Sequence, residues 1–156
     1  MKRIALYVLC TGMTLGYVAS CSHEPATPTA TISTDPNAPA ILREPELTTF
    51  ASLIMTADLL TFFQGTGPFT SFAPSNNAFI KFNKKTLEEL KKPKNRDQLI
   101  NLINYHVVMG KYMSGNLKPG NKTTVNGKEI TIRTENGVIW INNAKVTKTD
   151  LVGPNG

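Results

Sequence analysis

The chain has 156 residues, of which 40% are hydrophobic and 18% are charged, and its formal net charge is +6. This length allows one ordinary domain with additional segments, and the composition is that of a globular protein. The basic residues are spread over 81–96, 111–133 and 145–148 rather than gathered in one run. That distribution favours a mildly basic, solvated surface, and we expect no nucleic-acid partner.

The first twenty residues predict an export signal. Lys2 and Arg3 precede an apolar stretch, 4–18, which is too short to span a bilayer comfortably but fits a signal h-region. The next letters, VASC, end at Cys21 and resemble the motif of bacterial lipoprotein signals, in which the cysteine sulfur is acylated and the peptide is cut before it. The resemblance implies a signal peptide over 1–20 and lipidation of Cys21. The alternative is an ordinary signal peptide with an incidental cysteine.

Residues 21–45 predict a disordered tether. The stretch 22–45 holds five of the ten prolines and has no apolar period, so ordering it would bury too little surface to offset its entropy. A flexible segment of this length separates its ends by about 27 Å. No aspartate follows Cys21, which favours the outer membrane or cell surface of a bacterium. With Cys21 acylated and Cys10 removed, we expect no disulfide.

The first half of 46–156 predicts helices around one short strand. Apolar residues at helical spacing predict a helix from Leu47 to Phe63, closed by Gly65 as its C′ residue. The letters FTSFA, 69–73, predict a short buried strand. Three short helices should follow: one capped by Ser75, one opened by a capping box at Thr86–Glu89, and one from Asn95 to Tyr105 with Leu99, Leu102 and Ile103 on its inner face.

The second half predicts β-structure. YHVVMGKYM is β-branched and aromatic, and Asn126-Gly127 predicts a hairpin with a type I′ turn. Further turns at 135–137 and 142–143 separate more short strands. Since helices cluster first and strands second, the fold class is α+β.

Two segments resemble the fasciclin (FAS1) domain. FTSFAPSNNAF, 69–79, resembles the first hallmark of that family, and LINYHVVMGKYMSGNL, 102–117, resembles its middle, including a Tyr-His pair at Tyr105-His106. The matching hallmark residues are Thr70, Phe72, Ala73, Pro74, Asn77 and Phe79. The resemblance covers 46–156 and implies a β-sandwich wedge with an N-terminal cluster of short helices. It also implies an extracellular adhesion or interaction module for protein or glycan, with no catalytic residues and no cofactor.

The end of the chain departs from that family. Its second hallmark begins Asn-Gly and continues into a last strand, and Asn155-Gly156 resembles only the beginning. We therefore expect the C-terminal strand to be missing, which would leave ladder N–H and C=O groups unpaired. Three explanations stay open: a record cut short, a truncated gene with an inactive product, or a strand donated by another chain.

The polar residues offer little for catalysis. The histidines are His23 and His106, too few for a zinc site, so we expect no metal. A Ser-His-Asp arrangement would have to combine His106 with one of three serines and one of two aspartates: Ser71, Ser75, Ser114, Asp97 and Asp150. No Gly-x-Ser-x-Gly elbow is present.

Three residues are candidates for partner contact: Tyr105, His106 and Trp140. Each also has a structural interpretation, the first two at a helix-to-strand junction and Trp140 in the core. Thr70 and Asn77 are expected to tie a turn by side-chain hydrogen bonds. The chain is thus predicted to be a lipid-anchored, non-enzymatic interaction module of unknown oligomeric state. The alternatives are a small-ligand-binding or hydrolytic envelope lipoprotein, or an inactive fragment.

Overall fold

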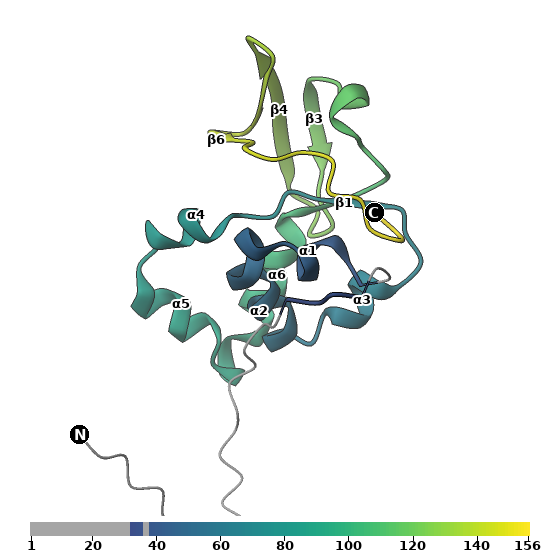
Figure 1. Cartoon of the computed structure of the whole chain (residues 1–156). Coiled ribbons are helices and arrows are strands. Elements are labelled where there is room, and N and C mark those ends of the chain that lie inside the picture. Colours follow the sequence, from purple (N-terminus) through teal and green to yellow (C-terminus); the bar gives the residue numbers. More distant parts are fainter. Residues whose placement is uncertain (1–31, 36–37) are drawn as a thin grey trace, which may run out of the picture.

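The computed structural model describes residues 32–35 and 38–156 (Figure 1). The predicted signal peptide, Cys21 and residues 22–31 and 36–37 of the predicted tether lie outside the described residues. The tether was predicted to extend to residue 45, but Ala40–Arg43 form a helix whose Ile41 and Leu42 are buried in the core, so the predicted end of the tether is wrong. Within the part that is described, no helix is both long enough and apolar enough to cross a membrane.

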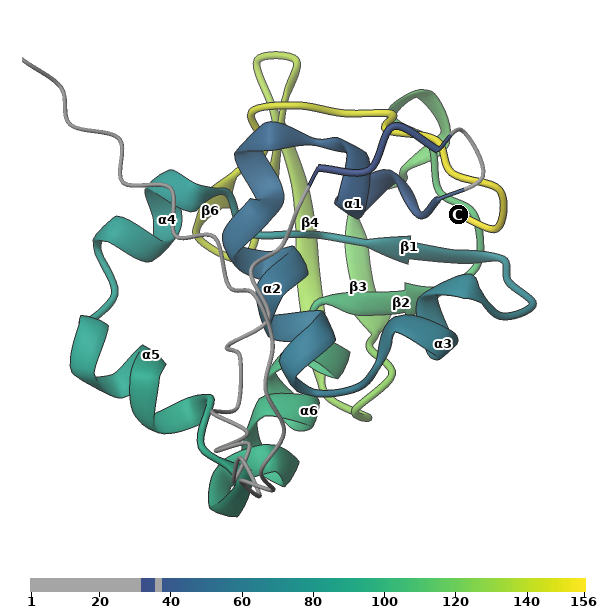
Figure 2. The same cartoon turned by 60° about the horizontal axis from the view of Figure 1, so that its bottom comes forward.

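Helices form the N-terminal part of the domain. The α-helices are α1 (Ala40–Arg43), α2 (Thr48–Thr56), α3 (Leu60–Gln64), α4 (Asn76–Ile80), α5 (Lys84–Leu90) and α6 (Arg96–Tyr105). Three 3-10 turns accompany them: η1 (Pro45–Leu47), η2 (Pro93–Asn95) and η3 (Ser114–Asn116). Figures 1 and 2 show α4 and α5 together on one side of the domain.

The strands form two antiparallel sheets. In the first, β1 (Phe69–Ser71) pairs with β2 (Val107–Met109), with Thr70 opposite Val108. The second has the order β3 (Gly120–Thr123), β4 (Glu129–Glu135), β5 (Val138–Ile141) and β6 (Ala144–Lys145). A bridge between Val108 and Thr124 joins the two sheets. The predicted α+β class is confirmed.

The core lies between the helices and the first sheet. Its most deeply buried side chains come from α2, α3, α6 and β2, and they include Phe50, Leu53, Ile54, Phe63, Leu99, Ile103 and Val107. Leu99 and Ile103 confirm the predicted inner face of α6, while Leu102 is half-buried. The rings of Phe63 and Phe69 pack edge to face with centroids 5.5 Å apart, which connects the helices to β1.

The helix predicted from Leu47 to Phe63 is broken, so that prediction is wrong. α2 ends at Thr56, and Asp58 has a φ of 59°, outside the helical range. The Arg96 guanidinium, 39 residues away, donates to the Ala57 carbonyl with its Nε and Nη2, at 3.3 and 3.2 Å. Arg96 thus stabilises the break, and it lies too far along the chain for the apolar spacing of 47–63 to indicate it. Gly65 has a φ of −72°, so it is not a left-handed C′ glycine.

Three predicted helix starts also differ. α5 begins at Lys84, where Asn83 accepts from the Lys85 N–H at 2.9 Å, and not with a capping box at Thr86. Ser75 precedes α4 but makes no side-chain capping bond. Asn95 likewise makes no side-chain capping bond to α6; its side-chain NH2 donates to the Glu89 carbonyl at 2.7 Å.

The hairpin at 126–127 forms without the predicted turn. Only Gly127 has a positive φ, 82°, whereas a type I′ turn needs positive values at both central residues. The Asn126 side chain instead accepts from the Lys128 N–H at 3.1 Å and from the Thr124 hydroxyl at 2.7 Å. Asn136 and Gly137, which connect β4 to β5, are the neighbouring pair in which both φ angles are positive, at 51° and 76°.

Candidate interaction groove

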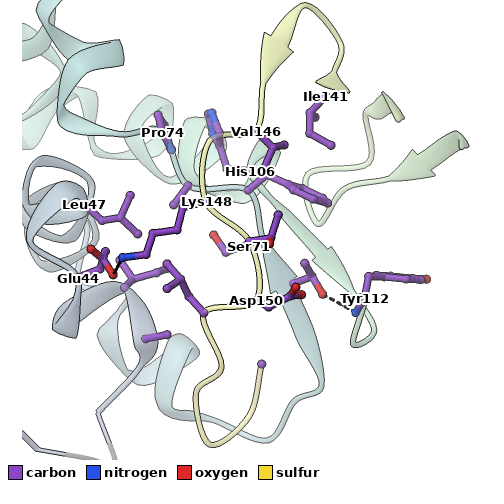
Figure 3. A pocket seen from close by; sticks show the side chains of 18 of the residues that line it. Glu44, Leu47, Ser71, Pro74, His106, Tyr112, Ile141, Val146, Lys148 and Asp150 are labelled. Carbon is purple, nitrogen blue, oxygen red and sulfur yellow. Dashed lines mark hydrogen bonds and ion pairs between the residues drawn. The ribbon is translucent and has the colours of Figure 1, made fainter. Parts of the chain in front are cut away.

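A groove of about 660 Å³ opens between β1 and the second sheet (Figure 3). One wall is β1 with the residues that follow it, another is β5 and β6, and a third is the segment 146–156. Most of the side chains that line it are apolar, and they include Leu47, Phe69, Phe72, Ala73, Pro74, Ile139, Ile141 and Val146. Its volume lies within the range of small-molecule sites in proteins.

The segment 146–156 is held in place by two residues from the beginning of the domain. Lys148 Nζ lies 2.7 Å from Glu44 Oε2, an ion pair visible at the rim in Figure 3. Arg43 Nη2 donates to the Val152 carbonyl at 2.7 Å. Both contacts join positions more than a hundred residues apart, so sequence patterns give no signal for this wall.

One edge of β1 faces this groove. The Phe72 N–H donates to the His106 carbonyl, and the Gly110 N–H donates to the Pro68 carbonyl, both at 2.8 Å. Even-numbered positions therefore direct their backbone groups toward β2. Since antiparallel pairing alternates, Phe69 and Ser71 direct theirs to the opposite edge. Among the described strands, β1 has β2 as its neighbour and none on that opposite edge.

Asn155 occupies the beginning of this edge. The Phe69 N–H donates to the Asn155 carbonyl at 3.3 Å. The Asn155 side-chain amide donates to the Phe63 carbonyl at 2.9 Å and also to the Gly65 carbonyl. The backbone approach is so close that a Cβ on Gly156 would lie 2.4 Å from the Phe69 oxygen. Beyond this point the edge at Ser71 is not paired with a described strand.

Ser71 is a polar side chain of the groove wall. Its Oγ is buried and has no hydrogen-bond partner in the described structure. Burying a hydroxyl without a partner costs free energy, of order 1–3 kcal/mol. A ligand in the groove that supplied a donor or acceptor would recover part of that cost.

His106 also lines the groove. Its Nδ1 lies 2.8 Å from the Leu102 carbonyl oxygen, and because a carbonyl only accepts, Nδ1 carries the proton and Nε2 is an acceptor. Burial lowers the pKa of His106 below its ordinary value, while the hydrogen bond to Leu102 opposes the shift. The ring packs edge to face on Phe50, with centroids 5.6 Å apart. His106 is thus a well-fixed side chain whose burial favours the neutral imidazole.

Comparisons with known proteins agree with this architecture. Residues 45–156 match the family model of the Fasciclin domain. The chain belongs to the fasciclin-domain family.

Relatives extend this result. Protein sll1483 of Synechocystis is 32% identical, with 99% of this chain and 90% of that protein aligned. Immunogenic protein MPB70 of Mycobacterium bovis is 33% identical over 74% of this chain and 60% of its own length. Human periostin is 30% identical over 73% of this chain, which corresponds to 14% of periostin. The predicted family is confirmed. MPB70 and periostin are longer, and this chain aligns with 60% and 14% of their lengths.

The hallmark residues of the fasciclin domain build one wall of the groove. Phe72, Ala73 and Pro74 line it, and Phe79 packs against the core. Thr70 joins β1 to the loop after β2: its hydroxyl donates to the Gly110 carbonyl at 2.8 Å and accepts from the Tyr112 N–H at 2.9 Å.

The turn-tying asparagine is Asn76, not Asn77 as predicted. Asn76 Oδ1 accepts from the Thr49 N–H at 2.9 Å, and its Nδ2 donates to the Pro45 carbonyl at 3.0 Å. It therefore connects the start of α4 to η1 and α2. Asn77 is exposed. Sequence reasoning chose the hallmark position and missed its neighbour, because both are asparagines and the contact partners lie about thirty residues earlier.

Tyr105 and His106 line the groove, whereas Trp140 does not. Tyr105 ends α6, and its hydroxyl accepts from Asn142 Nδ2 at 3.0 Å, joining the helix to the turn before β6. Trp140 lies on β5 opposite Arg133 and Lys145 and is half-buried. It does not line the groove, so the three candidates do not form one surface.

The serines, histidine and aspartates do not assemble into a hydrogen-bonded triad in the described structure. Asp150 accepts from the Ser114 N–H at 2.8 Å and from its hydroxyl, and these bonds lower the pKa of Asp150. The Nδ1 of His106 is engaged by the Leu102 carbonyl and not by a carboxylate. No group of three metal-binding side chains occurs among the described residues. In the part of the chain that the structure describes, the hydroxyl of Ser114 is bonded to Asp150 and that of Ser71 has no partner, so neither is hydrogen-bonded to His106.

Proposed function

We propose that this chain is a non-enzymatic interaction module of a bacterial cell envelope, anchored by lipid on Cys21, which binds another polypeptide in its groove. The anchor is supported by the lipoprotein-like motif at 18–21 and the tether that follows it. Membership of the fasciclin family supports an interaction module. The location at the outer membrane or cell surface is part of the same proposal.

The observation that carries the binding mode is the open edge of β1 beside an apolar groove. A segment in extended conformation can add itself to such an edge, with main-chain hydrogen bonds supplying affinity and alternate side chains entering pockets. Ser71 offers its backbone N–H and C=O on that edge, and its buried hydroxyl lies beside them. Ile139, Ile141 and Val146 offer an apolar surface for the partner's side chains. A glycan would leave these apolar side chains poorly covered.

The proposal predicts the chemistry of the partner segment. It should be extended, with apolar residues at every second position and with free backbone N–H groups. It should carry no proline at the pairing positions, because proline lacks the N–H that an edge strand needs. A second copy of this chain or a different envelope protein could each supply such a segment.

A peptide titration tests this proposal. A soluble peptide of alternating valine and threonine is compared with the same peptide carrying proline at every second position. Binding is followed by amide hydrogen exchange at Ser71 and by the shift of the thermal midpoint. We expect the first peptide to slow exchange at Ser71 and the proline peptide to have no effect.

A pair of variants makes the test specific. Ile141→Lys places a charge in the groove wall and should abolish the binding. Thr134→Lys places the same charge at an exposed position of β4 and should leave binding intact. Equal binding of both peptides, or no change at Ser71, would contradict strand addition.

A second candidate is the binding of a small apolar ligand. The groove volume of about 660 Å³ is within the usual range for small-molecule sites. The Ser71 hydroxyl and the His106 Nε2 would provide polar contacts. A thermal-shift screen with fatty acids, sugars and generic esters discriminates between the two functions. A ligand that raises the midpoint without protecting the Ser71 amide from exchange supports the carrier, and ester turnover lost in His106→Ala would support a hydrolase.

A further inference from the structure

The turn between α4 and α5 exposes apolar side chains to solvent. Ile80 is 75% exposed and Phe82 is 44% exposed. The neighbouring Phe79, which is in α4 like Ile80, packs against the core instead. The turn is ordered by its own backbone: the Phe82 N–H donates to the Phe79 carbonyl at 3.0 Å, and Asn83 caps α5 at 2.9 Å. These apolar groups are therefore presented on a fixed scaffold.

Three lysines lie next to these two residues in the sequence. Lys81, Lys84 and Lys85 are all exposed, and none of them forms an ion pair in the described structure. The carboxylates of α5 are engaged elsewhere, Glu88 with Lys91 at 2.9 Å and Glu89 with Lys92. The positive charge of the turn is thus not neutralised by its own helix. We call residues 80–85 the basic turn.

The basic turn projects from the domain. Both Figure 1 and Figure 2 show α4 and α5 at the side of the molecule, with the turn at its outer edge. No residue of 80–85 lines the groove. Contact at the basic turn can therefore occur while the groove is occupied.

We propose that the basic turn docks on the surface of an anionic phospholipid membrane. Ile80 and Phe82 would insert between headgroups, and the three lysines would lie at the level of the lipid phosphates. Charge complementarity favours this occupant, because a surface with unpaired cations around exposed apolar side chains matches the headgroup–acyl boundary. The proposal goes beyond the groove, but its biological setting rests on the proposed anchor, since a lipidated Cys21 would keep the domain near a membrane.

The test uses vesicles and a protein without the acyl chain. Residues 21–156 with Cys21→Ser are mixed with vesicles of phosphatidylcholine alone or with one-third phosphatidylglycerol, and the bound fraction is measured by sedimentation. We expect binding to the anionic vesicles, weak binding to neutral ones, and a strong decrease at high salt. Because this protein carries no acyl chain, its binding to vesicles tests the basic turn alone. The proposed lipid anchor on Cys21 is tested separately.

Matched variants identify the surface. Lys84→Gln with Lys85→Gln should weaken binding about 25-fold, at about fivefold per lysine. The control, Lys118→Gln with Lys128→Gln, removes the same charge from exposed positions elsewhere and should have a much smaller effect. Ile80→Ser should weaken binding about tenfold, whereas Met109→Ser, which changes another exposed apolar residue, should not.

Two results would overturn the proposal. If both lysine pairs weaken binding equally, the vesicles respond to net charge and not to the basic turn. If the lysine variants weaken binding but Ile80→Ser and Phe82→Ser do not, these two side chains do not insert into the membrane. An acidic protein would then be the better partner for the basic turn.

Discussion

The Asn155 carbonyl accepts a hydrogen bond from the Phe69 N–H at 3.3 Å, so the last residues of the chain lie along the same strand edge that borders the groove. The Asn155 side chain strengthens this junction through the Phe63 carbonyl at 2.9 Å. A residue near the end of the sequence thereby joins α3 to β1. This contact closes one end of the groove and leaves the edge at Ser71 available.

Asn155→Ala should destabilise the domain. The substitution removes the donor to two carbonyls, Phe63 and Gly65, and we expect the free energy of unfolding to fall by about 1–2 kcal/mol. Urea unfolding followed by circular dichroism provides the measurement. Asn143→Ala, at an exposed position, is the control and should change the unfolding free energy little.

Asn76 and Asn77 form a matched pair of neighbours. Asn76→Ala removes an acceptor for the Thr49 N–H and a donor to the Pro45 carbonyl, so it should cost about 1–3 kcal/mol of unfolding free energy. Asn77→Ala should cost less than about 0.5 kcal/mol, because Asn77 is exposed. Chemical denaturation of the two variants side by side checks the difference. A larger effect at Asn77 would show that the hallmark position, and not its neighbour, ties the turn.

Ser71→Ala should not destabilise the free protein. Its hydroxyl is buried without a partner, so its removal relieves a desolvation cost and should leave the thermal midpoint equal or slightly higher. The same substitution should weaken any groove ligand that bonds the hydroxyl. A clear drop of the midpoint in the absence of ligand would mean that the hydroxyl is already satisfied.

Stability should depend on pH through His106. Burial lowers the pKa of His106 in the folded state, so at acid pH the unfolded chain takes up a proton more readily than the folded one. The stabilisation from the neutral imidazole is complete above the unfolded pKa of about 6.5 and is lost as the pH falls through the lower folded pKa. We expect unfolding free energies measured by urea to decline below that pH.

Two variants test whether His106 causes the loss of stability at acid pH. His106→Gln should have a flatter dependence on pH in this window, whereas His23→Gln, in the predicted tether, should behave as the parent protein. A decline of the same size in His106→Gln would place the responsible group elsewhere.

Cys21→Ala should release the protein from membranes. The acyl chains proposed for Cys21 contribute about 0.8 kcal/mol for each buried methylene. Summed over an acyl chain, this contribution is larger than that expected from the basic turn. Fractionation of cells that express each form gives the measurement, and the intact mass of the mature protein gives the number of acyl chains. A Cys21→Ala protein that still requires detergent for extraction would count against lipidation.

Local sequence signals were sufficient for the type of most elements from β1 onward. Helical spacing in 96–105 and turn-forming pairs such as Asn136-Gly137 act over a few residues, and the structure places α6 and the β4–β5 turn there. The letters FTSFA predicted a short strand at 69–73, and β1 begins there, whereas the groove that Phe72, Ala73 and Pro74 line was not predicted. The junction at Tyr105-His106 was also found from sequence, since α6 ends at Tyr105 and β2 begins at Val107.

Only the tertiary structure decided the rest. The helix break at Asp58 depends on Arg96, the choice of Asn76 over Asn77 depends on η1 and α2, and the groove depends on contacts between its first and last segments, such as Glu44 with Lys148. These features come from hydrogen bonds and ion pairs between positions far apart in the chain. Periodicity and turn propensity describe a residue's near neighbours, so they carry no information about which distant backbone groups remain unpaired or which side chains will satisfy them.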